Sequence, residues 1–420
     1  MKNSTARKLR EVPSECVLLG VDPHKKKHAV VVMTREAVCR GKFKVDNSRR
    51  GYEELLERGR RCAAEEGKQG MMFGIEAASH YWRNLAYFLK ERGVPFRLIN
   101  PFSLKRRREG KDINRRKNDF RDAEAAADML RNGEFCDTRL PEAGYAELRS
   151  SYSAHCRLVQ ERSRLINLTK ALLGGLFPEF TLVFKDITGY TAMLVLTACA
   201  VPKEIAGMTE EEFVKMVTSV EGNRRVMTKK LRYLHQVAGS SIGVGVGTQG
   251  VAREISQLTQ RVRIVKEQIE ETQKHLKELV GSIDYAQYLL SIEGAGHMTV
   301  AGLLAELGSM RSYRKAKQLI KMAGTNPTES ESAGKRGSSR MSKKGRPGLR
   351  RCLWLAAISL LRHNSDFKRW AKERQERPSH QHPLKKREVI GAVANRFLRL
   401  VHALVRDKST YLMPQPVLSS

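Results

Sequence analysis

Short apolar runs separated by polar turns fill the N-terminal part of the chain. Residues 16–22, CVLLGVD, are nearly all apolar, which is typical of a central strand buried on both faces. GMMFGIEA, at residues 70–77, has the same character. We predict five strands here, the other three being AVVVMT, GKFKV and VPFRLIN.

Helical spacing of apolar residues appears between and after these strands. Residues 48–66 and 81–93 have it, and Gly93 ends the second segment. A further helix begins near Asn118. The resulting order, βββαβαβα, predicts a mixed sheet covered by helices.

Two long helices are predicted in the middle of the chain. Residues 141–173 carry apolar residues at helical intervals. Residues 255–279 step alternately by three and four, which makes a heptad seam with one polar position, Thr272. The two helices pair as an antiparallel arm, or join a second protomer as an assembly arm, and a plain helical bundle is equally open.

The segment between these helices, residues 174–250, predicts a small helical insert that ends in GSSIGVGVGTQG. This end has the spacing GxGxxG at Gly245, Gly247 and Gly250, which elsewhere marks a dinucleotide site. No strand–helix–strand unit surrounds it, and no acidic residue follows at the expected distance. We therefore interpret it as a loop.

The C-terminal part opens with a Gly-Ala-Gly turn between two apolar helices, at residues 289–308. This helix-hairpin-helix pattern presents backbone N–H groups to a DNA phosphate without reading the base sequence. A polar, Gly-rich and basic segment follows at residues 330–351, and two further apolar helices complete the part.

These patterns divide the chain into three predicted domains. Residues 1–137 form an α/β domain, residues 138–285 a helical region with coiled-coil character, and residues 286–420 a mainly helical domain. The predicted fold class is therefore α/β plus all-α.

The net charge of the chain narrows the range of functions that it could have. Lys and Arg number 77 against 45 Asp and Glu, a formal net charge of +32 over 420 residues. Such an excess is expected of a protein that binds a polyanion, most often nucleic acid. We expect no membrane association, because we find no basic amphipathic helix and no apolar run long enough to span a bilayer.

The seven cysteines form no CxxC pair, so we expect no zinc site. No signal-peptide pattern opens the sequence, so we expect a cytoplasmic protein.

Four carboxylates are placed where a metal-dependent nuclease needs them. Asp22 ends the first buried strand, and Glu76 lies near the end of another. Asp119 and Asp122 share one face of a helix. Together they would repel one another, and two Mg²⁺ ions would relieve that repulsion and hold a phosphodiester. Three of them also have an ordinary structural alternative. Asp22 would cap the turn before Pro23, Asp119 would lie at a helix start, and Asp122 would pair with Arg116 or Arg121.

The motifs GVDPHKKKHAVVV, GIEAASHYWRNLAYFL, RLINP and KNDFRDAEAAADM resemble the first domain of the DEDD transposases of insertion sequences. MAGTNP and ESESAGKRGSSRMSKKGRPGLRRCLWLAA are similar to the C-terminal domain of that family. The resemblance covers about residues 16–405. It implies an RNase H-like fold of the RuvC type for the first domain, with metal held by Asp22, Glu76, Asp119 and Asp122.

The same family implies a serine nucleophile shortly after the Ala-Gly-x-x-Pro turn. Counting from Pro327 places it on Ser332, with Ser330, Ser338 and Ser339 nearby. The family commonly has Ser-Gly here, whereas Ser332 is followed by Ala333. The family is also described as guided by a bridge RNA that pairs with donor and target DNA, and as acting in dimers or tetramers.

Two basic tracts are predicted to hold nucleic acid, DNA or RNA alike. Their residues are Lys105, Arg106, Arg107, Arg108, Arg115, Arg116, Lys117, Lys335, Arg336, Arg340, Lys343 and Lys344. The predicted activity is cleavage and rejoining of DNA strands. Two alternatives remain, a RuvC-type junction resolvase that uses water as nucleophile and a nucleic-acid scaffold without catalysis.

Overall fold

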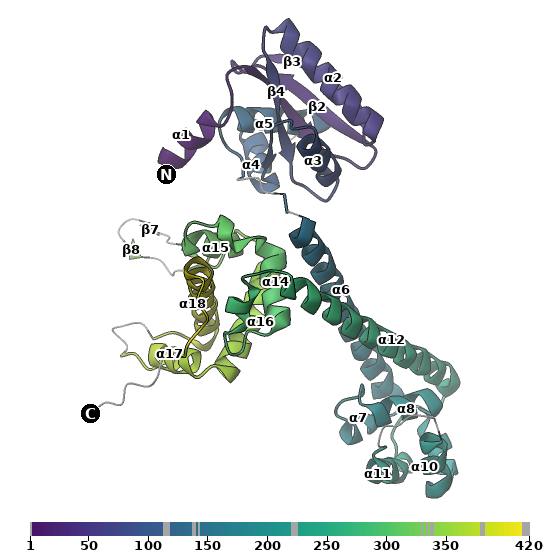
Figure 1. Cartoon of the computed structure of the whole chain (residues 1–420). Coiled ribbons are helices and arrows are strands. Elements are labelled where there is room, and N and C mark those ends of the chain that lie inside the picture. Colours follow the sequence, from purple (N-terminus) through teal and green to yellow (C-terminus); the bar gives the residue numbers. More distant parts are fainter. Residues whose placement is uncertain are drawn as a thin grey trace, which may run out of the picture. The chain divides into compact units, whose positions relative to one another are not determined.

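The computed structural model divides the chain into two compact units, residues 1–140 and 141–420 (Figure 1). The described residues are 2–111, 118–136, 140–141, 143–219, 226–328, 331–332, 335–336, 340–378 and 383–413.

The first unit is built on a mixed five-stranded sheet. Its elements are α1 (Lys2–Arg10), β1 (Cys16–Asp22), β2 (Lys27–Met33), β3 (Cys39–Asp46), α2 (Arg49–Glu65), β4 (Gly70–Glu76), α3 (Trp82–Glu91), β5 (Phe96–Ile99), α4 (Pro101–Lys111) and α5 (Asp119–Arg131). The strand order is β3-β2-β1-β4-β5. The first three strands pair antiparallel, whereas β4 runs parallel to both β1 and β5. The predicted mixed sheet is confirmed.

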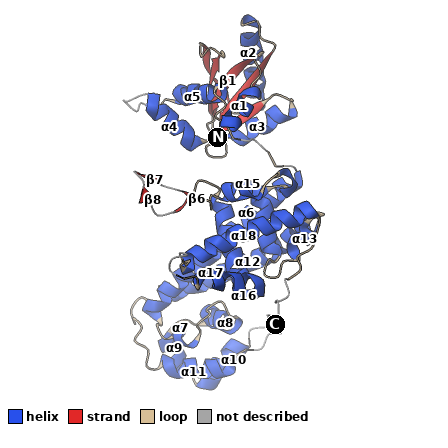
Figure 2. Ribbon diagram, turned by 90° about the vertical axis from the view of Figure 1, so that its left-hand side faces the viewer, coloured by secondary structure: helices blue, strands red, loops and turns tan. Residues whose placement is uncertain are grey.

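Helices cover both faces of this sheet (Figure 2). Alternate side chains of β1 divide between two cores, because successive residues of a strand point to opposite faces. Leu19 packs with α2 and α3, whereas Leu18 packs with α4 and α5. The sequence patterns missed α1 and α4. The sequence of α4, PFSLKRRREGK, buries one large apolar residue, Leu104, so its helical period is hidden by charge.

The second unit contains two long helices that pack along each other, α6 (Ala143–Leu176) and α12 (Thr248–Gly281). They run antiparallel, because Glu147 near the start of α6 faces His275 near the end of α12, while Glu161 faces Arg261. Six positions of the predicted seam are buried, and Val262, Val265 and Ile269 belong to one hydrophobic cluster with Leu165 of α6. The antiparallel arm is therefore the arrangement found, and it lies within one chain.

The predicted insert is helical and has a core of its own. It comprises α7 (Phe180–Val183), α8 (Tyr190–Ala198), α9 (Pro202–Gly207), α10 (Glu210–Thr218) and α11 (Thr228–Ala238), grouped at one end of the α6–α12 pair (Figure 1). Gly245 and Gly247 lie in the loop before α12, as interpreted from the sequence, whereas Gly250 lies in the first turn of α12.

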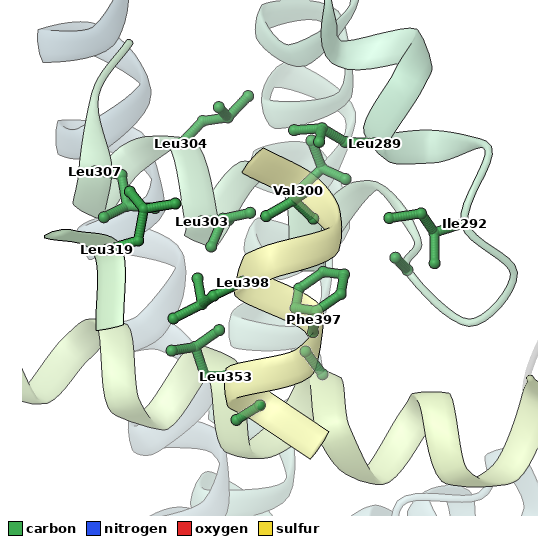
Figure 3. Close-up of a cluster of buried hydrophobic side chains, with 14 of the residues drawn as sticks. Leu289, Ile292, Val300, Leu303, Leu304, Leu307, Leu319, Leu353, Phe397 and Leu398 are labelled. Atoms are coloured by element: carbon green, nitrogen blue, oxygen red, sulfur yellow. The ribbon is translucent and has the colours of Figure 1, made fainter. Parts of the chain in front are cut away.

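The remaining helices pack around α18 (Lys386–Asp407). They are α13 (Ala286–Leu290), α14 (His297–Leu307), α15 (Ala316–Ala323), α16 (Pro347–His363) and α17 (Ser365–Gln375), with a short 3-10 turn at Met310–Ser312. Phe397 and Leu398 of α18 project among leucines of α14, α15 and α16 (Figure 3). The predicted helical content is confirmed, and the phosphate-binding role of the α13–α14 turn stays a prediction.

Short strands appear in the basic segment, for which no strands had been predicted. β6 (Pro327–Thr328) pairs with β9 (Arg340–Met341), and β7 (Glu331–Ser332) pairs with β8 (Lys335–Arg336). None of the seven cysteines, all of which are among the described residues, forms a disulfide. Among the described helices, none is both long and apolar enough to cross a membrane.

Candidate active site

Two predicted carboxylates end neighbouring parallel strands of the first unit. Asp22 is the last residue of β1, and Glu76 is the last residue of β4. The register pairs Val21 with Ile75, so the two acids occupy equivalent positions at the same edge. Because the carboxyl ends of parallel strands share an edge, these side chains can meet, and Glu76 does share a hydrogen bond with Asp22.

The other two carboxylates lie in the first turn of α5. Asn118 caps this helix, and its side chain accepts a hydrogen bond from the N–H of Phe120. An acidic first turn suits the positive end of the helix dipole. Asp122 is buried, whereas the side chain of Asp119 is 37% exposed. Charge interactions of Asp22 with both Asp119 and Asp122 place all four acids in one cluster.

Small residues bring α5 close enough to the sheet for this cluster to form. A Cβ on Gly20 of β1 would lie 1.9 Å from the carbonyl oxygen of Ala123. A Cβ on Gly74 of β4 would lie 2.9 Å from the carbonyl oxygen of Ala126. The alanine run of α5 is therefore a packing surface, and the close approach carries Asp122 to the strand ends.

The cluster contains a histidine that the sequence prediction did not include. His24 Nε2 lies 3.0 Å from Asp22 Oδ2 and 3.4 Å from Asp119 Oδ1. One ligand atom from each of these three residues lies within 4.8 Å of the others. In the sequence, only its position could have pointed to His24 as a member of the cluster, because it follows a strand-ending aspartate by two residues.

A hydrogen-bonded chain holds the turn that carries His24. The backbone N–H of His24 donates to Nδ1 of His28, at 3.2 Å. The other ring nitrogen of the fully buried His28 lies 3.4 Å from the hydroxyl of Tyr52, which donates to Asn47. Burial lowers the pKa of His28 to about 4, so the ring is neutral and free to accept from the turn.

Burial and mutual repulsion perturb the strand-end acids. Burial raises the pKa of Glu76 to about 7, and the charges of Asp22 and Asp122 add to the effect. Burial also raises the pKa of Asp22, against the opposing influence of His24. A carboxyl pair of this kind shares a proton near neutral pH, and a divalent cation would take the place of that proton.

Two cations of the chain already contact the α5 acids. Lys44 Nζ lies 2.9 Å from Asp119 Oδ2, and this hydrogen bond lowers the pKa of Asp119. Arg108 Nη1 of α4 lies 2.5 Å from Asp122 Oδ1. Arg108 is thus a partner of Asp122 in the structure, whereas Arg116, one of the two arginines expected there, lies outside the described residues.

The first basic tract is divided between internal and exposed side chains. Arg107 joins Arg108 in facing acids, lying 2.9 Å from Asp128 and 2.8 Å from Glu134. Lys105 and Arg106 are exposed, and the Arg106 guanidinium lies 4.5 Å from the ring centre of the exposed Phe102. Arg115, Arg116 and Lys117 lie outside the described residues. The assignment of this tract to nucleic acid stays a prediction.

The predicted nucleophile belongs to the second unit. Ser332 pairs with Lys335 in the β7–β8 hairpin, and Arg336 follows on β8. Arg340 begins β9, and Lys343 and Lys344 are exposed beyond it. Ser330, Ser338 and Ser339 lie outside the described residues.

Family models match both units. A model of DEDD transposases, described as "Transposase", matches residues 19–178. A second, described as "Transposase IS116/IS110/IS902 family", matches residues 286–372. The first match includes all four carboxylates, and the second includes the β6–β9 segment.

Relatives match over most of the chain. The "Insertion element IS116 uncharacterized 44.8 kDa protein" of Streptomyces clavuligerus is 23% identical over 96% of this chain and 97% of its own length. The "Probable family 20 transposase" of Pseudomonas aeruginosa is 25% identical over 80% of this chain and 83% of its own. A solved T. thermophilus RuvC in complex with a Holliday junction substrate covers 28% of this chain and 91% of that one, at 16% identity and a TM-score of 0.20. A score this low does not bear on the fold.

Proposed function

The chain belongs to the IS116/IS110/IS902 family of transposases, and from this premise we propose that it cuts and rejoins DNA at a divalent-metal centre formed by Asp22, Glu76, Asp119 and Asp122. One observation carries the proposal. Acids from β1, β4 and α5, which are separate in sequence, converge on one edge of the sheet. Structural ion pairs alone do not account for this, because among the described residues the lysine and arginine ion pairs of the cluster are made by the α5 acids, Lys44 with Asp119 and Arg108 with Asp122.

The residues fit the metal that the family implies. Carboxylate oxygens are the ligands that Mg²⁺ and Mn²⁺ take in phosphoryl-transfer sites. Burial and the charges of Asp22 and Asp122 raise the pKa of Glu76 to about 7, and a bound cation would offset this repulsion between the carboxylates. Bound there, divalent ions would polarise the scissile phosphate and favour the deprotonated nucleophile.

Ser332 is the proposed nucleophile. Its hydroxyl oxygen forms a bond to phosphorus while one phosphodiester P–O bond breaks, and the released deoxyribose hydroxyl takes up a proton. A deoxyribose hydroxyl then attacks this phosphoserine, which joins a new strand and releases the serine hydroxyl. One phosphodiester P–O bond forms for each one that breaks, so the bond energy is conserved. Lys335 and Arg336, neighbours on the hairpin, supply positive charge for the attacked phosphate.

Nucleic acid would be held by the exposed basic residues of each unit, Lys105 and Arg106 in the first and Lys343 and Lys344 in the second. The Arg106–Phe102 pair combines a guanidinium with an aromatic face, which suits a phosphate beside a base. Following the family, we propose donor and target DNA as substrates, a non-coding guide RNA as a partner, and a dimer or tetramer as the active form.

The RuvC-type alternative has one observation in its favour. All four acids lie in the first unit, so the metal centre is complete without the serine. A resolvase of that kind would use water and would not retain a covalent link to DNA.

Substitution of the serine separates the two functions. The substrate is supercoiled plasmid DNA carrying the element's ends, with RNA transcribed from the element's non-coding region. Wild-type protein should join strands and form a covalent protein–DNA adduct, and Ser332→Ala should lose both while still binding DNA. Ser330→Ala is the matched control. If Ser332→Ala still cleaves DNA, the resolvase function is supported.

If Asp119→Asn and Asp122→Asn still cleave DNA, the proposed metal centre is refuted. Loss of strand joining after RNase treatment would support the guide RNA.

A further inference from the structure

His24 lies inside the carboxylate cluster. Its side chain is 44% exposed as a whole, yet the Nε2 atom is buried between Asp22 and Asp119. That nitrogen has no hydrogen-bond partner, although Asp22 Oδ2 is only 3.0 Å away. The ring is close to the acid without being oriented to donate to it.

The spacing of these atoms suits a shared ion better than an ion pair. Neighbouring ligands of an octahedral ion at about 2.1 Å lie about 3 Å apart. His24 Nε2 lies 3.0 Å from one carboxylate oxygen and 3.4 Å from the other. An ion pair would instead align an N–H with one oxygen, and the alignment is missing. One ring nitrogen and two carboxylate oxygens that lie within 4.8 Å of one another form a ligand set.

The turn between β1 and β2 fixes this arrangement. Because the His24 N–H donates to the buried His28 ring, the main chain of the turn is tied to the core of the first unit. Asp22, at the end of β1, and His24 are therefore presented from one short rigid segment. The sequence D-P-H places both ligands there, with Pro23 restricting the backbone between them.

We propose that His24 is a direct metal ligand, which together with Asp22 and Asp119 forms one of two unequal metal positions. This inference rests on the proposed metal centre and deepens it. The two remaining acids, Glu76 and Asp122, offer only oxygen ligands. Mg²⁺ is bound through oxygen, whereas an imidazole nitrogen favours transition ions. The position that contains His24 therefore prefers Mn²⁺ over Mg²⁺.

Binding of the metal alone to the full chain tests this without any assay of activity. Titration calorimetry measures Mn²⁺ and Mg²⁺ affinity, and electron spin echo spectroscopy of bound Mn²⁺ detects a coordinated ring nitrogen. Wild-type protein should give the nitrogen signal. His24→Ala should abolish it and weaken Mn²⁺ binding about tenfold or more, with a smaller effect on Mg²⁺. His80→Ala, which removes an exposed histidine whose ring lies tilted against that of Tyr81, should retain both.

Two further variants separate failure of this inference from failure of the proposed function. His24→Gln restores an oxygen ligand, so it should recover Mg²⁺ binding without the nitrogen signal. If Asp119→Asn weakens Mn²⁺ binding but His24→Ala does not, His24 is no ligand and the metal centre stands. If the wild-type chain binds neither ion, the metal centre and the role of His24 are both wrong.

Discussion

Gly20 of β1 lies directly against the backbone of Ala123 in α5, so close that a Cβ on Gly20 would come within 1.9 Å of the Ala123 carbonyl oxygen. The strand and the helix touch there without a side chain between them. Asp22 lies two residues beyond Gly20, and Asp122 immediately precedes Ala123. The separation of the two acids is therefore set by this contact.

Gly20→Ala should displace α5 and disturb the cluster. We expect a loss of about 1–3 kcal/mol in the free energy of unfolding, as for overpacked cores, together with weaker Mn²⁺ binding. Denaturant unfolding and metal titration measure the two effects. Gly41→Ala is the control, because its Cβ would meet Val32 only at 3.9 Å. Equal behaviour of the two variants would refute the close-packing argument.

Removal of Arg108 should affect the metal-free protein most. Its guanidinium contacts the buried Asp122, so Arg108→Ala leaves that carboxylate without this cation and should cost about 3 kcal/mol in the presence of EDTA. Saturating Mn²⁺ should recover much of this loss, because the ion replaces the missing positive charge. Thermal unfolding with and without metal measures the difference, with the exposed Lys105→Ala on the same helix as the control. An unchanged melting temperature in EDTA would mean that the contact contributes nothing.

Acid should destabilise the first unit through His28. The folded pKa is about 4, below the ordinary value of 6.5, so the unfolded chain binds the additional proton between these values. The stabilisation is complete above about pH 6.5 and is lost as pH falls toward 4, by about 3 kcal/mol. His28→Gln should remove this part of the pH dependence, as measured by denaturant unfolding in EDTA, whereas His80→Gln should not. Parallel curves for wild type and His28→Gln would contradict the assignment.

Truncation of the α6–α12 seam should destabilise the second unit within a single chain. Ile269 is buried against α6, and Ile269→Ala should lower the free energy of unfolding by about 2–4 kcal/mol. Glu270→Ala, on the exposed side of the same turn, is the control. The loss should be independent of protein concentration. A concentration-dependent loss would indicate that the seam also joins protomers.

The strand-end acids could be predicted from the sequence because their position follows from strand direction alone. Asp22 and Glu76 end two buried apolar runs, and parallel pairing brings such ends together. The first turn of α5 was predictable from its cap and its acids. The alanine run that follows was visible, but its use as a packing surface depends on glycines in two distant strands.

His24 and Arg108 could not be predicted, for different reasons. His24 lies in a turn, and its direction depends on a hydrogen bond to a histidine four residues later. Arg108 lies in a run of basic residues that resemble one another in sequence. Which of them faces inward is decided by the rotation of α4 about Leu104, and the sparse apolar content of that helix gives no period from which to predict it.

The insert at the end of the α6–α12 pair leaves and rejoins the arm almost at one point. Val244 donates its N–H to the carbonyl oxygen of Gly175 at 2.9 Å, so the two ends of the intervening segment are held together. The entropy cost of closing a loop grows only slowly with its length, and here the closure is already made by the arm itself. This position can therefore accept segments of very different size with little effect on the helices beneath, which makes it a natural place for related chains to gain, lose or exchange a module.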